Sequence, residues 1–433
     1  MTDTLFIEGG RVIDPASGTD GVRTVVVRDG KIAEVAERVE RPRDARSIDA
    51  RGRWVTPGFV DLHVHLREPG QEYKETVATG ARAAVAGGFT TICAMPNTKP
   101  VNDSASVTEL VLARAAQAGL ARVLPVGCVS RGQGGEDLAE YGELAAAGCV
   151  AVSDDGKPVA SSALMRRALE YARAFDLPVA VHEEDPLLAG KGVMHEGAVS
   201  TRLGLKGVPA AAEEVMVLRD LALLELTGGR LHLQHVSTKG SVRAVRDAKR
   251  RGLAVTAEVT PHHLSLTDED VAASGYSTDF KMNPPLRSAE DVAAVREGLA
   301  DGTLDAVATD HAPHTEVEKD LEFDAALNGI VGLETAFPVC LELVRRGVLA
   351  ERRLVEALTI GPARAFGLSA GTLARGAAAD LAVLDPAAEW VVEPARLFSK
   401  SKNTPWKGKR LVGRCVYTVV GGRIVHAEGR AER

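Results

Sequence analysis

The sequence predicts an α/β fold: a (β/α)8 TIM-type barrel joined to a small β-sandwich subdomain formed by both chain ends. Eight short apolar runs alternate with longer, alanine-rich segments whose apolar residues recur at helical spacing. Continuous apolar runs, rather than alternating ones, are typical of parallel strands buried on both faces. A strand and a helix repeated eight times indicate a parallel barrel wrapped by helices.

Length and composition support one large globular chain. The 433 residues allow a barrel of roughly 300 residues with a subdomain attached. With 45% hydrophobic and 26% charged residues, the chain can bury a sizeable core. The 52 basic and 59 acidic residues leave a net charge of −7, which argues against a general binder of nucleic acid or acidic membranes. A small-molecule substrate is therefore the expected partner.

Cysteine usage and the N-terminal residues predict a soluble, cytoplasmic protein. The five cysteines are widely spaced, odd in number and without a C-x-x-C pair. The first residues lack the basic region and apolar run of a signal peptide, and no stretch of about 18 uncharged apolar residues follows.

Short strands separated by turns are expected at both ends of the chain. Neither end alone has enough strands to bury a face. We therefore expect one composite β-rich subdomain from residues 1–56 and 366–433, around a barrel at 57–365. Its strands are predicted at 5–8, 11–13, 23–27, 381–385, 416–420 and 423–425, with hairpin turns at Asp29-Gly30 and Gly421-Gly422.

The middle of the chain supplies the barrel elements in order. Strands are predicted at 58–65, 89–95, 123–129, 149–153, 178–182, 231–235, 253–259 and 305–309. Helices are predicted at 76–86, 104–118, 160–174, 210–226 and 288–299.

Histidines and carboxylates gather where the predicted strands end, which is where such barrels carry their sites. His63 and His65 stand two apart on the first strand, so both point to the same side and can share a metal ion. A single polar residue at a strand end often only caps the next helix, but here five strand ends carry histidine or aspartate. The others carry Asp154 and Asp155, His182, His235, and Asp310 with His314.

The residue types indicate the metal and the chemistry. Histidine with carboxylate, and without cysteine, favours Zn²⁺, and more than four protein ligands indicate two ions. Two such ions can activate a water molecule and polarise a carbonyl beside it. Asp310 can both touch a metal and exchange a proton with that water. These features predict hydrolysis or cyclisation of an amide-like bond.

Several motifs resemble those of a known family. Residues 56–70, TPGFVDLHVHLREPG, resemble the opening metal motif of the cyclic amidohydrolases, and in particular of dihydroorotases of the long bacterial type. The resemblance runs in order over nearly the whole chain. Further matching segments are 94–98, 153–156, 259–264, 281–287, 308–314, 371–373 and 379–381.

The resemblance implies two zinc ions in each chain. His63 and His65 would bind the first ion, and His182 and His235 the second. Asp310 would be both a ligand of the first ion and the proton shuttle.

An aspartate on the fourth strand would bridge the two ions together with a hydroxide. Strand alternation does not choose between Asp154 and Asp155, and the family pattern points to Asp155. In hydantoinases, which are close relatives, a carbamylated lysine occupies this place. Lys157 falls after Gly156, beyond the expected strand end, so Asp155 is preferred over it.

The family's substrate carries a free carboxylate, which needs cationic or amide donors. By resemblance, Arg67, Asn97 and His314 would hold this carboxylate, while Asn283 and the backbone around Asn328 and Gly329 would hold the ring amides. The complete set implied for substrate binding is His65, Arg67, Asn97, Asn283, His314, Asn328 and Gly329.

The implied activity is that of a zinc-dependent dihydroorotase, which interconverts N-carbamoyl-L-aspartate and L-dihydroorotate plus water in de novo pyrimidine (UMP) biosynthesis. Two alternatives stay open. One is a hydantoinase or allantoinase with the same fold and metals, and the other is a non-catalytic homologue that partners aspartate carbamoyltransferase. A homodimer and an association of the active enzyme with that transferase also stay open.

The remaining histidines and one loop receive structural interpretations. His232, His262 and His263 are expected to pack beside the site rather than bind metal, and His311 to orient Asp310. The charged segment 316–324 suits either a mobile lid or an ordinary surface loop.

Overall fold

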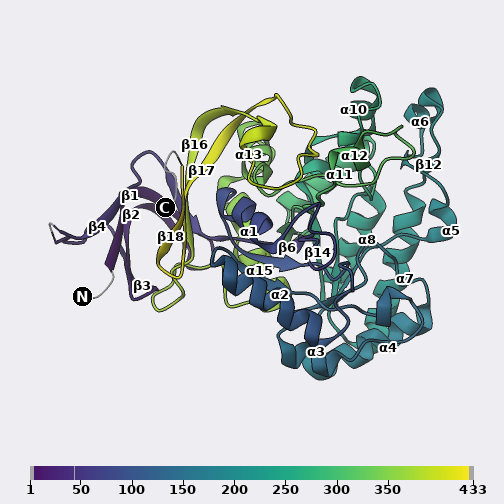
Figure 1. Ribbon diagram of the computed structural model, residues 1–433, viewed down its shortest axis with the longest axis horizontal. Coiled ribbons are helices and arrows are strands. Elements are labelled where there is room, and N and C mark those ends of the chain that lie inside the picture. The colour runs from purple at the N-terminus through teal and green to yellow at the C-terminus, as the bar shows by residue number, and fades with distance from the viewer. Residues whose placement is uncertain (1–3, 43, 429–433) are drawn as a thin grey trace.

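The computed structural model of the protein describes residues 4–42 and 44–428. Strands from the two chain ends, purple and yellow in Figure 1, lie side by side at one side of the molecule. The helices from the middle of the chain, in teal and green, extend away from them toward the other side. No helix in these described ranges is long and apolar enough to cross a membrane.

The chain ends form one subdomain, as expected, and its strands are linked into a single hydrogen-bonded sheet. Its strand order is β18-β17-β16-β5-β1-β2-β3, with β4 paired to β1. Strand β5 pairs with β1 and also with β16, so the strands from the two chain ends belong to one sheet. The strands are β1 Thr4–Asp14, β2 Thr19–Arg28, β3 Lys31–Ala36, β4 Arg46–Asp49, β5 Trp54–Pro57, β16 Leu381–Val391, β17 Arg410–Val420 and β18 Arg423–Ala427.

Two tight turns in this sheet follow from their residues. Asp29 and Gly30 have φ of 49° and 74°, and Gly421 and Gly422 have φ of 55° and 79°. Two consecutive positive φ values are what a type I′ hairpin turn requires, and its twist matches that of the flanking strands. The two strands expected at 5–8 and 11–13 run together as β1, with an irregular register between Ile7 and Gly10.

The eight strands predicted for the middle of the chain are all present as parallel strands. Two sheets contain them, β6-β7-β8 and β9-β10-β13-β14-β15. Parallel bridges join the two sheets at both margins, from Gly127 to Val152 and from Val64 to His311. The strands are β6 Phe59–Val64, β7 Phe89–Ala94, β8 Arg122–Pro125, β9 Val152–Ser153, β10 Val179–Val181, β13 Leu231–Leu233, β14 Val255–Val259 and β15 Ala306–Val307; β11 Met194–His195 and β12 Gly207–Val208 form a separate pair.

Helices follow the strands, and the five predicted ones are confirmed. Hydroxyl side chains fix several starts: Thr76, Thr238 and Ser288 each accept a backbone N–H from the first turn of α1, α8 and α11. The α-helices are α1 Val77–Ala86, α2 Ala105–Ala118, α3 Tyr141–Ala147, α4 Ser162–Ala172, α5 Pro186–Ala189, α6 Ala198–Leu203, α7 Ala211–Thr227, α8 Lys239–Arg250, α9 Pro261–Ser265, α10 Asp268–Ala273, α11 Ala289–Ala300, α12 Glu316–Lys319, α13 Ala336–Arg345, α14 Glu351–Leu358 and α15 Ile360–Phe366. Short 3-10 turns are η1 Arg131–Gln133, η2 Arg173–Phe175, η3 Thr278–Phe280 and η4 Pro394–Arg396.

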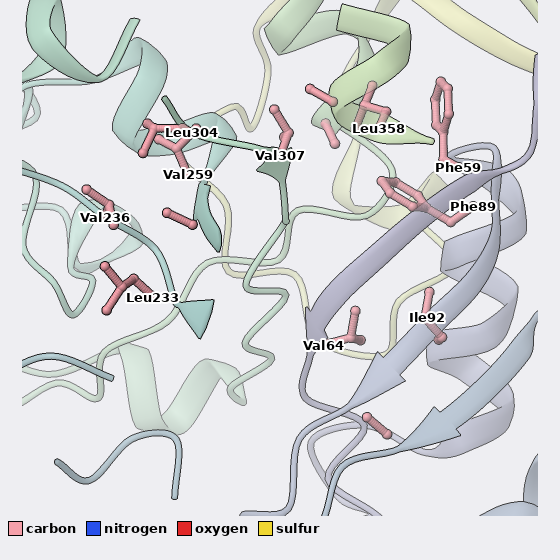
Figure 2. Close-up of a cluster of buried hydrophobic side chains, with 14 of the residues drawn as sticks. Phe59, Val64, Phe89, Ile92, Leu233, Val236, Val259, Leu304, Val307 and Leu358 are labelled. Atoms are coloured by element: carbon pink, nitrogen blue, oxygen red, sulfur yellow. The ribbon is translucent and has the colours of Figure 1, made fainter. Parts of the chain in front are cut away.

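The main core fills the space around the parallel strands. Figure 2 shows Phe59 and Phe89 of neighbouring strands together, and their rings meet edge to face with centroids 5.5 Å apart. Leu233, Val259 and Val307 continue this core from β13, β14 and β15. Apolar packing of this kind fixes the strands, so the polar residues at their ends are held in place by the core.

Candidate metal centre and substrate pocket

Five parallel strands end in residues that meet at one point. His63 lies in β6, and the other residues lie one to three positions beyond their strands. All of them are buried, with side chains at most 5% exposed. The residues brought together are His63 and His65, Asp155, His182, His235, and Asp310.

One group within this cluster contains His63, His65 and Asp310. The Asp310 Oδ1 atom lies 3.1 Å from His65 Nε2 and 3.5 Å from His63 Nε2. Asp155 faces the same two nitrogens, with Oδ1 3.2 Å from His63 Nε2 and Oδ2 3.3 Å from His65 Nε2. Two ligands bound tetrahedrally at zinc-like distances would stand about 3.3 Å apart. These spacings therefore fit a shared metal ion.

The second group contains His182 and His235. Their facing atoms, His182 Nδ1 and His235 Nε2, lie 3.0 Å apart. Asp155 Oδ1 lies 3.8 Å from the first of these atoms and 3.6 Å from the second. Asp155 thus stands between the two groups.

The neighbouring acidic residue is used differently. Asp154 accepts hydrogen bonds from the backbone N–H groups of Val129 and Ser130 and from the Ser130 hydroxyl. Its carboxylate is therefore occupied in holding the preceding loop, while Asp155 faces the histidines. Lys157 points elsewhere, with Nζ donating to the Gln133 carbonyl.

Partners on the far side of two rings orient them. His63 Nδ1 lies 2.8 Å from Glu258 Oε1, and His65 Nδ1 lies 2.8 Å from Asn97 Oδ1. Each Nδ1–H can donate to its oxygen, which leaves the Nε2 lone pair facing the centre. His63 Nε2 is buried and has no hydrogen-bond partner among the residues that the structure describes. An orphaned lone pair beside two carboxylates fits a bound cation.

The pKa shifts of Asp155 and His63 also favour a bound cation. Burial alone would raise the pKa of Asp155, but the imidazoles of His63 and His235 outweigh it and hold that pKa well below its usual range. Burial lowers the pKa of His63, yet Asp155 and Asp310 raise it well above its ordinary value. The two carboxylates thus favour positive charge at His63 Nε2, and a divalent cation supplies it as well as a proton does.

Backbone strain accompanies the site. Arg67, His235 and Asp310 have φ of 62°, 32° and 45°, in the left-handed region that is costly for residues other than glycine. Asp61 fixes two of the strand ends, since its carboxylate accepts the N–H and hydroxyl of Thr309 and the N–H of His63. Core packing and these hydrogen bonds sustain the strained conformations.

A pocket of about 240 Å³ opens beside the metal cluster. Six of the seven residues expected to bind substrate line it, namely His65, Arg67, Asn97, Asn283, His314 and Asn328. Arg67 is buried: its Nε donates to the Pro313 carbonyl, and one Nη lies 3.3 Å from His314 Nε2. Burial, then Arg67 and Lys74, lower the pKa of His314 to about 2, so its ring is neutral. The pocket thus combines a buried guanidinium with amide and imidazole groups.

Gly329, the seventh, does not line the pocket. Its N–H donates to the Lys281 carbonyl, and its carbonyl accepts from Lys319 and Asn403. A Cβ at this position would stand 2.6 Å from the His314 ring and 2.5 Å from the Ala312 carbonyl oxygen. The glycine lets the chain pass close behind His314.

Other sequence-based interpretations have mixed outcomes. His232 packs beside the site as expected, with Nε2 3.0 Å from Glu258 Oε2. His311 does not orient the Asp310 carboxylate: its Nε2 lies 3.3 Å from Glu75 Oε2, and its Nδ1 accepts from Gly332. The segment 316–324, which suits either a lid or an ordinary surface loop, begins with the short helix α12.

Sequence reasoning missed two buried carboxylates, Glu258 and Asp61. Each is an acidic residue inside an otherwise apolar predicted strand, at 253–259 and 58–65. An unpaired charge there is costly to bury, so its presence is a signal for a polar partner inside the barrel.

Comparison with known proteins identifies the family. The chain is 82% identical to a protein named Dihydroorotase from Anaeromyxobacter sp. (strain K), over 433 residues and 100% of both chains. The chain belongs to the dihydroorotase family. A second dihydroorotase, from Geotalea daltonii, is 55% identical over 98% of this chain and 99% of its own. Residues 52–241 match the Dihydro-orotase-like family.

Solved structures resemble this member of the dihydroorotase family over its whole length. An L-hydantoinase (dihydropyrimidinase) from Arthrobacter aurescens superposes with a TM-score of 0.88 at 27% identity, covering 100% of this chain and 98% of that one. A D-hydantoinase from a Thermus species gives a TM-score of 0.82 at 25% identity, covering 98% and 96%. The mixed α/β architecture is therefore that of the hydantoinase-type amidohydrolases.

Proposed function

We propose that the chain is a zinc-dependent dihydroorotase, which interconverts N-carbamoyl-L-aspartate and L-dihydroorotate plus water in de novo pyrimidine biosynthesis. The observation that carries the proposal is the meeting of four histidines and two aspartates with the guanidinium of Arg67 at one pocket. Full-length relatives named dihydroorotase support the choice of substrate.

The donor set suits Zn²⁺. His63, His65 and Asp310 would hold one ion, His182 and His235 the other, and Asp155 would contribute to both. When bound there, divalent ions would polarise a substrate carbonyl and lower the pKa of a water molecule.

The pocket residues would bind and orient the substrate. The Arg67 guanidinium can hold a carboxylate through two parallel hydrogen bonds, and burial strengthens that contact. Asn97 accepts from His65 through its oxygen, which leaves its amide nitrogen free to donate. Neutral His314 can donate or accept beside them, while Asn283 and Asn328 supply amides for the ring.

Asp310 would move the proton. In hydrolysis a water molecule adds to the ring carbonyl carbon, the ring C–N bond breaks, and the departing nitrogen needs a proton. The Asp310 carboxylate takes the proton from the attacking water and delivers it to that nitrogen. Cyclisation of N-carbamoyl-L-aspartate runs through the same steps in reverse and releases water.

A substrate comparison on the purified, metal-loaded protein tests this proposal. We expect turnover of L-dihydroorotate with about two zinc ions for each chain. A simple hydantoin lacks the carboxylate that Arg67 would hold, so we expect little turnover of it. Preference for hydantoin would reassign the chain to the hydantoinase type, and a protein that binds metal but turns over neither would favour the non-catalytic role beside aspartate carbamoyltransferase.

The architecture behind this function is proposed as a closed (β/α)8 barrel. The two parallel sheets contribute eight strands, and the bridges from Gly127 to Val152 and from Val64 to His311 support closure into one ring. We place the barrel at residues 57–365 and the composite subdomain at 1–56 and 366–433.

The cellular setting is part of the same proposal. All five cysteines are free and buried, which suits the reducing cytoplasm in which we place the enzyme. A homodimer and an association with aspartate carbamoyltransferase remain proposals, and sedimentation of the enzyme alone and with the transferase tests both.

A further inference from the structure

One wall of the substrate pocket is a segment without regular secondary structure. Leu327 and Asn328 line the pocket from this segment, and Gly329 passes directly behind His314. Between residues 320 and 335 the structure has no helix or strand. The backbone of this wall is bonded to neighbouring segments at single positions, such as the isolated bridge from Ile330 to His311 and the hydrogen bond from the Gly329 N–H to the Lys281 carbonyl. Side-chain contacts supply the rest.

Two buried lysines supply many of those contacts. Lys281 Nζ donates to the carbonyls of Asp324 and Ala326 at 2.9 and 2.7 Å. Lys319 Nζ donates to the carbonyls of Leu327 and Gly329 at 2.8 and 3.2 Å. Both lysines are at most 6% exposed, and neither forms an ion pair with a carboxylate within the described residues. An ammonium group buried without a carboxylate is costly, so four carbonyls collected from one short segment point to a positional role.

Asn403, from the C-terminal part of the chain, also donates a hydrogen bond to the wall. Its amide nitrogen donates to the carbonyls of Gly329 and Ala312, both at 2.9 Å. Its amide oxygen accepts the N–H of His314 at 3.0 Å. The side chain is 3% exposed, and one residue thus ties the wall to the loop that carries His314.

We propose that Lys281, Lys319 and Asn403 form a carbonyl clamp that sets the position of the 324–329 wall against His314, and thereby the affinity for substrate. This inference rests on the proposed function, because the wall is assigned there to the ring of the substrate. The three are positioning residues: they act through Asn328 and His314, and none of the three lines the substrate pocket.

The clamp makes a kinetic prediction that general destabilisation does not. Lys319→Met removes the hydrogen bonds that Lys319 donates to the carbonyls of Leu327 and Gly329, and it changes none of the proposed metal ligands. We expect KM for dihydroorotate to rise about tenfold, as for the loss of one net hydrogen bond, with kcat changed less than about threefold. Lys319→Arg keeps the charge and the donors and should recover most of the lost affinity.

Lys402→Met is the matched control. Lys402 also donates to two backbone carbonyls, those of Leu397 and Ser399, and although Asn403 follows it in the chain, neither of these bonds reaches the 324–329 wall. We expect its KM to stay within about twofold of the wild-type value. An equal rise in KM for both variants would overturn the clamp.

Hydrogen exchange followed by mass spectrometry tests the clamp without using activity. Peptides that cover 324–331 should exchange faster in Lys319→Met, while peptides from β6 and β15 should not change. Faster exchange throughout the chain, or a fall in kcat at unchanged KM, would contradict the proposal. If Lys319→Met does not fold, Asn403→Ser, which removes another donor to Gly329, must give the same local pattern. If the wild-type enzyme fails to turn over dihydroorotate, the proposed function fails, and the exchange measurement still decides the clamp.

Discussion

His63 and His182 both face Asp155, but they are held in different ways. His63 lies in β6 and is held by Glu258 of β14, a carboxylate inside the strand bundle. Although burial opposes ionisation, hydrogen bonds from His232 and His63 lower the pKa of Glu258 to about 2. His182 instead has the Asn283 side-chain amide 3.2 Å from its Nε2, and Asn283 lies in a loop that also lines the substrate pocket.

We call the group that contains His63 the strand-held half of the centre, and the group that contains His182 the loop-held half. A buried carboxylate partner fixes the ring of His63 whether or not substrate is present. A loop amide that substrate can also contact makes the position of His182 depend on the loop. The clamp residue Lys281 lies two positions before Asn283, so the same loop connects His182 with the 324–329 wall. His65 resembles His182 in this respect, because its partner Asn97 is also a pocket-lining amide. We infer that rigidity is concentrated at His63 and adaptability at His182.

The largest effect is expected in the strand-held half, at Asp310. Asp310→Ala removes the proposed proton carrier, and we expect kcat to fall by about 10² to 10⁴. The other five side chains proposed as metal ligands remain, so zinc content measured by mass spectrometry should stay near the wild-type value. Unchanged turnover would refute the role, and loss of both zinc and activity would show instead that Asp310 acts mainly as a ligand.

Variants of Glu258 and Asn283, which contact His63 and His182, test whether the two histidines are held differently. Glu258→Gln should weaken zinc binding about 10- to 100-fold, the cost usual for loss of a carboxylate behind a metal-bound histidine. Asn283→Ala should weaken it less, because a neutral amide polarises the ring less than a carboxylate does. Zinc remaining after dialysis against graded chelator measures both. A larger loss in Asn283→Ala would reverse the assignment of rigid and adaptable halves.

The strand-held half is also the part that the sequence predicted best. His63 and His65 stand out because strand periodicity places both on one side of an apolar run, and Asp310 stands out because it ends another. The terminal strands were predictable for a related reason, since Asp29-Gly30 and Gly421-Gly422 have local turn preferences that tertiary contacts do not override.

The loop-held half was less accessible to prediction. Pairing of Asp154 with Val129 and Ser130 depends on contacts across 24 and 25 residues, and no local rule separates it from Asp155. Lys281 and Asn403 lie in irregular segments and Lys319 ends the short helix α12, and at all three positions a solvated polar side chain is the ordinary expectation. Only the fold brings them to the same carbonyl groups. The pairing of β5 with β16, which joins the two chain ends, is likewise a long-range contact whose register no local rule gives.

A smaller effect on catalysis is expected at Arg67, which bridges the two halves at the pocket. Arg67→Lys keeps a positive charge but loses the paired donors that match a carboxylate. We expect KM for dihydroorotate to rise about 10- to 100-fold, the equivalent of one to two strong hydrogen bonds, and a neutral hydantoin to be turned over no worse than before. Equal losses on the two substrates would show that Arg67 supports the fold of the site rather than recognition of the carboxylate.

The smallest effect is a pH dependence of stability in the loop-held half. Burial lowers the pKa of Lys319 from 10.5 to about 7. Between these two values the folded chain has released a proton that the unfolded chain still holds, so the free energy of unfolding should rise with pH across this window. The single proton limits the slope to about 1.4 kcal/mol per pH unit. Urea unfolding of the wild type and of Lys319→Met, at several pH values between about 6 and 9.5, isolates this contribution as the difference between their slopes. Parallel curves would mean that the carbonyls of Leu327 and Gly329 keep Lys319 charged throughout, and the clamp would then hold the wall through charge-assisted hydrogen bonds even in alkaline solution.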